Sequence, residues 1–241
     1  MVASREIEKK IESIEPAKVF TVGDLGFPPD WWENVRVKLG RMVRDGRLEK
    51  AGRGKYFRPK MTVFGNIGPD PDEMVKDLMN DAGSLSGYTT GYTVWNKMGL
   101  TTQIPNVIMI GTSRRRDSLK RGRYEIRFIT QPNRITPRNI PLLRILDSLK
   151  LIKQIPDARI DKSIEILGRY IVNIDEKDRP LLVKLALKYP PRIRALLGAI
   201  LESAGDQLQA ENLKNTLNPT TSYRIGLTNA SALNLKNWNI E

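Results

Sequence analysis

The chain has 241 residues, with 40 Lys and Arg against 27 Asp and Glu, and it contains neither cysteine nor histidine. The missing cysteines exclude disulfides, thiolate metal sites and cysteine nucleophiles, and the missing histidines exclude Ser-His-Asp, Cys-His and His-metal chemistry. The net charge of +13, concentrated in residues 36–60 and 114–138, is typical of a protein that binds a polyanion, with a merely soluble basic protein as the alternative.

The chain begins with two predicted helices. Isoleucines recur at helical spacing in the first of them, at Ile7, Ile11 and Ile14. Ser4 is its expected N-cap and Pro16 ends it. Residues 19–21 form either a short strand or an extended link. A brief second helix is expected over 22–25, before the prolines and glycine of 26–29 force a turn.

The third predicted helix, about residues 30–45, has two chemically different faces. Asp30 is its expected N-cap. On a wheel of about 100° per residue, one face is apolar and contains Trp31, Val35, Leu39, Met42 and Val43. The opposite face is mainly cationic and contains Glu33, Arg36, Val37, Gly40, Arg41 and Arg44. This division is typical of a helix that packs on a core and faces phosphates, although a solvated surface helix is the bland alternative.

A basic two-stranded ribbon follows this helix directly. Leu48 and Ala51 alternate with charged residues, Gly52 and Gly54 are expected to supply a tight turn with Arg53 at its tip, and Pro59 ends the second strand. Residues 35–60 hold ten Lys and Arg against two acids. A helix followed by a basic ribbon is the layout of a winged helix-turn-helix, so residues 1–60 predict duplex DNA as a partner.

Residues 61–138 predict a mixed α/β segment. A helix with an acidic N-terminus is expected to start at 69–73, and another is expected over 88–98, ending at Gly99. Strands at 107–110 and 124–130 are expected to pair as an antiparallel hairpin. The loop at its tip is a basic run that would bind phosphate or an acidic partner, or simply be solvated: Arg114, Arg115 and Arg116.

Residues 139–241 predict a mainly helical part. The apolar spacing indicates four helices, at 140–153, 161–172, 179–188 and 191–204, and the Asn-rich tail after Leu213 is expected to be irregular. The predicted fold class is therefore α+β, with a winged helix-turn-helix at 1–60, a mixed segment at 61–138 and a helical part at 139–241. A single domain over 61–241 is the alternative.

No catalytic constellation is recognisable. The chain lacks a phosphate-binding Walker loop and a dinucleotide fingerprint. Asp157 and Asp161 are spaced to share a helix face, but neighbouring cations make a metal site there improbable. We predict a protein that is not an enzyme, with no catalytic residue, cofactor or metal. A Mg²⁺-dependent nuclease is the least favoured alternative, because only Asp117 and Glu125 lie in the basic 106–138 segment.

Three stretches carry a family resemblance. They are residues 39–60, residues 87–105 with their Leu-Thr-Thr-Gln-Ile-Pro core, and residues 217–227. The sequence resembles the AbiEi-type antitoxins of nucleotidyltransferase toxin–antitoxin systems, in the branch with an N-terminal winged helix. The resemblance implies a repressor that binds its own operator DNA. It also implies that residues 61–241 antagonise a nucleotidyltransferase-like toxin, often in phage defence. The pair Trp31-Trp32 departs from the small polar residues of that helix start.

The leading hypothesis is a DNA-binding antitoxin that represses its own operon, and binding as an oligomer on DNA stays open. The residues predicted to contact DNA are Trp32, Arg36, Arg41, Arg44, Arg53, Lys55 and Arg58. An effector-responsive winged-helix regulator without a toxin partner is the alternative. The N-terminus lacks the apolar core of a signal peptide, and no apolar run approaches the roughly 18–20 residues that span a bilayer. A cytoplasmic protein that does not enter a membrane is therefore expected.

Overall fold

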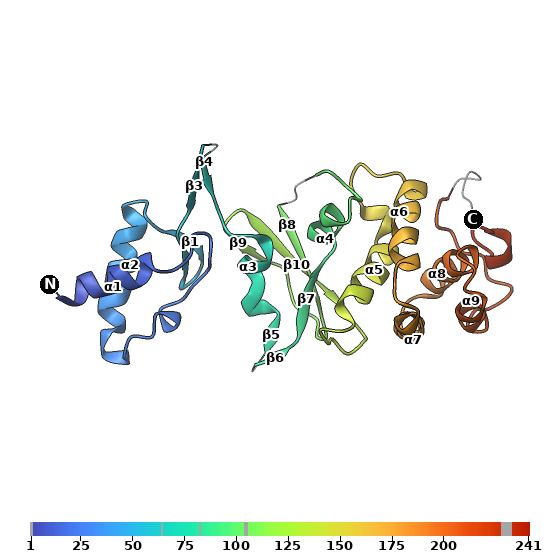
Figure 1. Ribbon diagram of the computed structural model, residues 1–241, viewed down its shortest axis with the longest axis horizontal. Helices are drawn as coiled ribbons and strands as arrows, with labels where there is room; N and C mark the ends of the chain where they lie inside the picture. The colour runs from blue at the N-terminus through green and yellow to red at the C-terminus, as the bar shows by residue number, and fades with distance from the viewer. Residues whose placement is uncertain (1, 64, 82, 104–105, 228–232) are drawn as a thin grey trace. The chain divides into compact units, whose positions relative to one another are not determined.

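The chain divides into two compact units. A computed structural model describes residues 2–63, 65–81, 83–103, 106–227 and 233–241 (Figure 1). Unit 1 comprises Met1–Leu78 together with Leu119–Glu125, and unit 2 comprises Met79–Ser118 together with Ile126–Glu241. Helices and short antiparallel strand pairs occur in both, which confirms the α+β class. The boundary predicted at residue 60 lies inside unit 1.

Unit 1 starts with two α-helices separated by short 3-10 turns. The helices are α1 (Val2–Glu12) and α2 (Trp32–Arg44), and the turns are Gly23–Leu25 and Pro29–Trp31. The brief helix predicted over 22–25 is thus a single 3-10 turn. The prediction that Ser4 caps the first helix is wrong, because α1 already begins at Val2 and Ser4 lies within it.

The apolar faces of α1 and α2 meet in one core. Its fully buried members are Ile7, Ile11, Phe20, Leu25, Val35, Leu39, Met42 and Leu48. Trp31 and Val43 are half-buried against this core. The predicted inward face of α2 is therefore confirmed, because the 3.6-residue period alone decides which side chains share a face.

The predicted ribbon consists of β1 (Glu49–Gly52) and β2 (Lys55–Phe57), paired antiparallel with an irregularity between Lys50 and Gly52. Gly54 has the expected positive φ of 69° and Gly52 does not. Phe20 adds a third extended segment, since its backbone N–H and C=O both bond to Tyr56 at 2.9 Å. The short-strand alternative for residues 19–21 thus holds for Phe20.

Unit 1 continues through elements that the sequence only partly predicts. A second hairpin, β3 (Lys60–Thr62) with β4 (Gly65–Ile67), was not expected. Helix α3 (Pro71–Val75) carries the predicted acidic start, with the Asp70 side chain accepting a hydrogen bond from the Asp72 N–H at 2.9 Å, and a 3-10 turn, Lys76–Leu78, follows.

Asp77 joins three separate stretches of unit 1. The Arg121 guanidinium donates to the Asp77 carboxylate at 2.8 Å and to the Met74 carbonyl at 2.7 Å. The Lys55 ammonium forms an ion pair with the same carboxylate. These contacts link β2, the end of α3 and the segment Leu119–Glu125, which explains why that segment belongs to unit 1.

The Asp77 contacts predict a stability that depends on acid pH. Burial opposes ionisation, but hydrogen bonds from Arg121 and Lys55 outweigh it and lower the pKa of Asp77 from 3.8 to about 2. The resulting stabilisation is present above pH 3.8 and is lost as pH falls towards 2. The side chain is partly exposed, so we expect Asp77→Asn to cost about 1 kcal/mol at neutral pH. Urea unfolding between pH 7 and pH 2 should show this difference shrinking below pH 4, and a pH-independent difference would contradict the assignment.

Unit 2 contains most of a four-stranded sheet with the order β7-β8-β10-β9. Its strands are β7 (Gly87–Thr90), β8 (Val107–Thr112), β9 (Leu119–Arg121) and β10 (Tyr124–Thr130), and a small separate pair is formed by β5 (Asn80–Asp81) and β6 (Ser84–Leu85). The two predicted strands at 107–110 and 124–130 are confirmed as neighbours. They do not form a simple hairpin, because β9 lies between them in sequence.

The helix predicted over 88–98 is wrong in its first part. Residues up to Thr90 form β7, which pairs antiparallel with β8, and helix α4 (Tyr92–Lys97) begins only afterwards. Gly91 makes the change of direction, with φ 65° and ψ −131°, a conformation that glycine adopts readily. The predicted C-terminal glycine is confirmed, since Gly99 has φ 71°.

The remainder of unit 2 is helical, as predicted. The helices are α5 (Ile140–Lys150), α6 (Ile160–Val172), α7 (Arg179–Ala186), α8 (Pro191–Ser203) and α9 (Gln207–Lys214), with 3-10 turns at Ile152–Gln154, Glu176–Asp178 and Lys236–Trp238. Helix α5 packs on β7 and on three other helices (Figure 1). One core cluster extends from Tyr88 to Ile240. In the described part of the chain, every helix is too short or too polar to cross a membrane.

A polar network is buried inside this core. The Asp147 side chain on α5 is 1% exposed and accepts hydrogen bonds from Tyr88 Oη at 2.7 Å, Thr90 Oγ1 at 3.0 Å and Tyr189 Oη at 2.7 Å. The Gln131 amide donates to both tyrosine hydroxyls at 2.8 Å. Each hydroxyl proton is therefore directed at Asp147, and the network joins β7, α5 and the end of α7.

Candidate nucleic-acid interface

The ten cations of residues 35–60 divide into two groups by their contacts. Four of them bond to other parts of unit 1: Lys38, Arg47, Lys55 and Arg58. The other six are exposed: Arg36, Arg41, Arg44, Lys50, Arg53 and Lys60. The positive charge available to a partner is therefore smaller than the sequence total.

Two of the internal cations connect α1 to α2 and its following turn. Lys38 Nζ donates to Glu8 Oε2 at 2.6 Å, and Arg47 donates to Glu12 Oε1 at 2.6 Å as well as to Glu8. The hydrogen bonds from Lys38 and Arg47 lower the pKa of Glu8 below its ordinary value. These pairs hold α2 against α1. Lys38 and Arg47 therefore belong to the contact between the two helices and not to the outward face of α2.

Lys55 and Arg58 were predicted to contact DNA, and the structure gives both a role within the fold. Lys55 pairs with Asp77. Arg58 is half-buried, and its Nε and Nη2 donate to the Ile14 carbonyl at 3.0 and 2.6 Å. Both partners lie far away in sequence, so the ribbon sequence alone could not reveal them. Neither cation is included in the interface proposed below.

The outward face of α2 carries the predicted arginines. Arg36, Arg41 and Arg44 are exposed. Arg36 forms only an exposed pair with Glu33 at 3.5 Å, a kind of contact that is worth little. Arg41 and Arg44 have no partner among the residues that the structure describes. The face thus presents guanidinium groups that are free to bind an anion.

Trp32 has a local role at the start of α2. Its indole N–H donates to the Phe27 carbonyl at 3.0 Å, and the Arg36 guanidinium lies 6.0 Å from the centre of its ring. The side chain is still 36% exposed. Trp32 therefore fixes the turn before α2 and positions Arg36, while its predicted contact with DNA stays a prediction.

The hairpin supplies two further exposed cations. Arg53 lies in the β1–β2 turn, where it was predicted, and Lys50 lies on β1. Within the described ranges of the chain, neither has a partner. Lys50 is absent from the predicted set, although it directly precedes the buried Ala51, and successive strand residues point to opposite faces.

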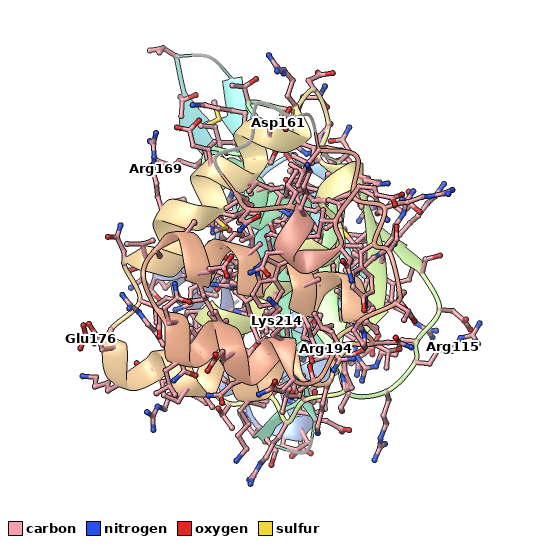
Figure 2. The ribbon with its side chains drawn as sticks, turned by 90° about the vertical axis from the view of Figure 1, so that its right-hand side faces the viewer. Arg115, Asp161, Arg169, Glu176, Arg194 and Lys214 are labelled. Atoms are coloured by element: carbon pink, nitrogen blue, oxygen red, sulfur yellow. The ribbon has the colours of Figure 1, made fainter. Side chains whose placement is uncertain are left out.

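The basic loop Arg114–Arg116 belongs to unit 2 and is exposed, and Figure 2 shows Arg115 extending from the surface. Thr112 Oγ1 donates to the Arg114 carbonyl at 2.7 Å, and the Arg116 guanidinium lies 5.7 Å from the Phe128 ring. A small cavity of about 210 Å³ beside the loop also contains the Asp81 carboxylate, which opposes an anion there. The predicted phosphate or partner contact stays a prediction.

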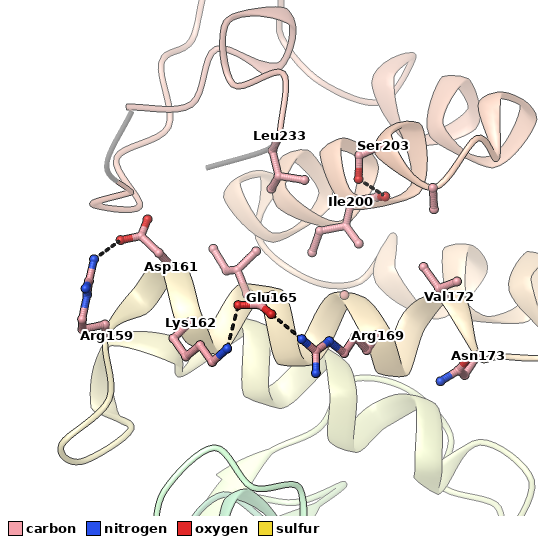
Figure 3. Close-up of a pocket in the computed structure, with 13 residues that line it drawn as sticks. Arg159, Asp161, Lys162, Glu165, Arg169, Val172, Asn173, Ile200, Ser203 and Leu233 are labelled. Carbon is pink, nitrogen blue, oxygen red and sulfur yellow. Dashed lines mark hydrogen bonds and ion pairs between the residues drawn. The ribbon is translucent and has the colours of Figure 1, made fainter. Parts of the chain in front are cut away.

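A cavity of about 870 Å³ lies in unit 2 between α6 and α8 (Figure 3). Its charged groups form ion pairs with one another, including Lys162–Glu165 at 2.8 Å and Arg159–Asp161 at 3.8 Å. Asp157 accepts a hydrogen bond from Gln103 and lies before the start of α6, so the two aspartates do not share a helix face as predicted. Among the described residues, no three acidic side chains gather as a metal site would require. The charged groups that line the cavity are thus paired mainly with one another.

Comparisons with known proteins give a family and a fold. A family model described as "Family of unknown function (DUF6088)" matches residues 6–179. The crystal structure of the RV2827C protein from Mycobacterium tuberculosis is similar, with a TM-score of 0.66 and 12% sequence identity over 99% of this chain and 90% of that chain. At that identity the likeness concerns the fold alone. No curated protein matches the sequence.

Proposed function

We propose that this chain, which belongs to the DUF6088 family of unknown function, binds duplex DNA through the outward face of α2 and the β1–β2 turn. The observation that carries the proposal is the division of the cations. After four of the ten are used inside unit 1, the arginines of α2 and the hairpin cations still face solvent.

The order of elements in unit 1 supports the same proposal. Helix α1, two 3-10 turns, α2 and the β1–β2 hairpin follow one another, and Phe20, before the first 3-10 turn, bonds to β2. We interpret this order as that of a winged helix-turn-helix, in which the second helix of the motif would enter the major groove. The groove is about 12 Å wide and admits a helix, and arginine pairs bidentately with guanine or with phosphate. In this arrangement Arg53 would reach the flanking backbone as part of the wing.

A double substitution tests the proposal. Arg41→Ala/Arg44→Ala is expected to weaken binding to the chain's own promoter duplex by about 30-fold or more, because each guanidinium contact to a base or phosphate contributes about 1–3 kcal/mol. Fluorescence anisotropy with the full chain measures it. The matched control is Lys184→Ala/Arg192→Ala, which removes the same charge from exposed positions of unit 2. An equal loss in both variants, or in neither, would overturn the proposed interface.

The proposal that the chain is an antitoxin rests on its resemblance to the AbiEi-type antitoxins. We propose that unit 2 antagonises a nucleotidyltransferase-like toxin, while unit 1 represses the operon. Co-expression with a neighbouring nucleotidyltransferase-like gene tests this, because growth should be restored by the wild type and equally by Arg41→Ala/Arg44→Ala. Continued toxicity with a stable, abundant protein would exclude the antagonism.

An effector-responsive regulator is the second candidate. Its support is the α6–α8 cavity, whose volume of about 870 Å³ falls in the range of about 300–1,000 Å³ usual for small-molecule sites. The test is a screen of metabolite mixtures for release of the promoter duplex from the full chain. Gly168→Phe would fill the cavity from α6. This candidate is favoured if a mixture releases the duplex from the wild type but not from Gly168→Phe, and it is excluded if no mixture releases the duplex.

A further inference from the structure

The outward face of α2 has an apolar gap among its arginines. On a wheel of about 100° per residue, Val37 and Gly40 fall between Arg36 and Arg41, opposite the buried face, and Arg44 follows one turn after Gly40 on the same side. The Val37 side chain is 46% exposed. A Cβ atom at Gly40 would meet nothing within 4 Å among the described atoms. The gap consists of Val37 and Gly40, three residues apart and therefore adjacent on the helix surface.

Gly40 lowers the stability of α2, and no contact within the described chain explains why a glycine stands there. Glycine in a helix interior is about 1 kcal/mol less favourable than alanine, because its backbone loses more freedom on folding. Gly40 is the ninth residue of the thirteen in α2, well away from either end. Open space surrounds its Cβ position, so no packing contact inside the described chain requires a missing side chain. The close approach of another molecule to α2 would require the missing side chain at Gly40.

Val37 has the chemistry of a base contact. The thymine 5-methyl group is the apolar feature that the major groove presents, and aliphatic side chains contact it. A valine that is nearly half exposed between two arginines matches that methyl group, with Arg36 and Arg41 placed for the neighbouring bases or phosphates. The missing side chain at Gly40 would let the helix backbone lie deeper in the groove.

We propose that the apolar gap is the thymine-reading part of α2: Gly40 permits close approach to the duplex, and Val37 contacts a thymine methyl group. This inference rests on the proposed DNA binding and adds a sequence preference to it. It assigns base reading to an apolar pair, with the surrounding arginines supplying affinity.

Gly40→Ala is the first test, because stability and binding should change in opposite directions. The melting temperature of the full chain is expected to rise by about 2–5 °C, from improved helix propensity. Affinity for a duplex selected by the wild type from a library with randomised centres is expected to fall about tenfold. The control is Lys184→Ala in α7, an exposed helix position of unit 2. That variant should keep its affinity.

The second test replaces the thymines of the selected duplex by deoxyuridine, which removes only the methyl groups. Wild-type affinity is expected to fall about fourfold for each contacted thymine, the value of about one buried methyl group. Val37→Ala, which lacks both terminal methyl groups of valine, should discriminate between the two duplexes less than the wild type does. If Val37→Ala still discriminates as strongly as the wild type, the contact is not made by Val37 and the inference is overturned.

The outcomes separate the two proposals. Failure of the wild type to select any duplex overturns the DNA-binding proposal itself. Binding that requires Arg41 and Arg44, yet is indifferent to Gly40→Ala and to deoxyuridine, overturns only the apolar gap. A fall in both melting temperature and affinity for Gly40→Ala would also count against it, because the loss would then come from a damaged helix.

Discussion

Asp147→Ala is expected to lower the free energy of unfolding of unit 2 by about 3–5 kcal/mol, because three buried hydroxyl donors lose their shared acceptor. The substitution leaves the hydroxyl groups of Tyr88, Thr90 and Tyr189 without their acceptor inside the core. An unsatisfied buried donor costs about 1–3 kcal/mol. Guanidinium unfolding followed by near-UV circular dichroism measures the change.

Single tyrosine variants provide the control. Tyr88→Phe and Tyr189→Phe each remove one donor to Asp147 and leave the remaining hydroxyls in place, so each should cost only about 1–2 kcal/mol. An Asp147→Ala cost no larger than these would show that the carboxylate is not the centre of the network.

The same network predicts how stability varies with acidity. Burial raises the pKa of Asp147 above its ordinary 3.8, and three hydroxyl donors only partly offset it. The folded state therefore binds the proton more tightly than the unfolded state, and this contribution to stability is complete below pH 3.8 and lost as pH rises through the folded pKa. In Asp147→Asn, the free energy of unfolding should lack this pH-dependent contribution.

Gly198→Ala is the second large effect that we expect. A Cβ atom at Gly198 in α8 would lie 2.2 Å from two atoms of the Trp238 ring. The ring is 2% exposed, and its N–H donates to Glu202 Oε2 at 3.0 Å. Since a rigid indole cannot yield by that much, the tail bearing it must shift, at a cost of about 3 kcal/mol. Thermal unfolding gives the measurement.

A double-mutant cycle identifies the cause. In a Trp238→Ala background the ring is absent, so Gly198→Ala should cost little or become slightly stabilising, and the coupling between the two sites should exceed about 2 kcal/mol. Gly168→Ala, with only an ordinary contact to Ile200, provides the matched glycine control in a neighbouring helix. Additive effects at Gly198 and Trp238 would contradict the steric explanation.

Local patterns predicted much of unit 1, because the period of apolar residues decides which side of a helix is buried. Val35, Leu39 and Met42 are inward, and Arg36, Arg41 and Arg44 are outward, as the wheel indicated. The contacts of individual cations could not be predicted in the same way. Lys38 bonds to Glu8 and Arg58 to the Ile14 carbonyl, partners that only the folded chain brings near.

Errors in unit 2 have similar causes. The local pattern predicts a helix where the strand ending at Thr90 lies, because the pairing of this strand with β8 depends on a segment that follows later in the chain. Helix α9 was missed, although Asp206 after Gly205 was an available N-cap signal, and its side chain accepts from the Gln209 N–H at 3.3 Å. The buried role of Asp147 was not predicted, although a single carboxylate in an apolar helix indicates a buried polar partner.

The membership of Leu119–Glu125 in unit 1 has a consequence for synthesis on the ribosome. Asp77 is made well before Arg121, so the N-terminal unit emerges without one of the two cations that its carboxylate binds. At about 5–20 residues per second, the nascent chain waits a few seconds for that partner. Residues 79–118 of unit 2 are translated within that interval, so unit 1 is completed only after part of unit 2 has been synthesised.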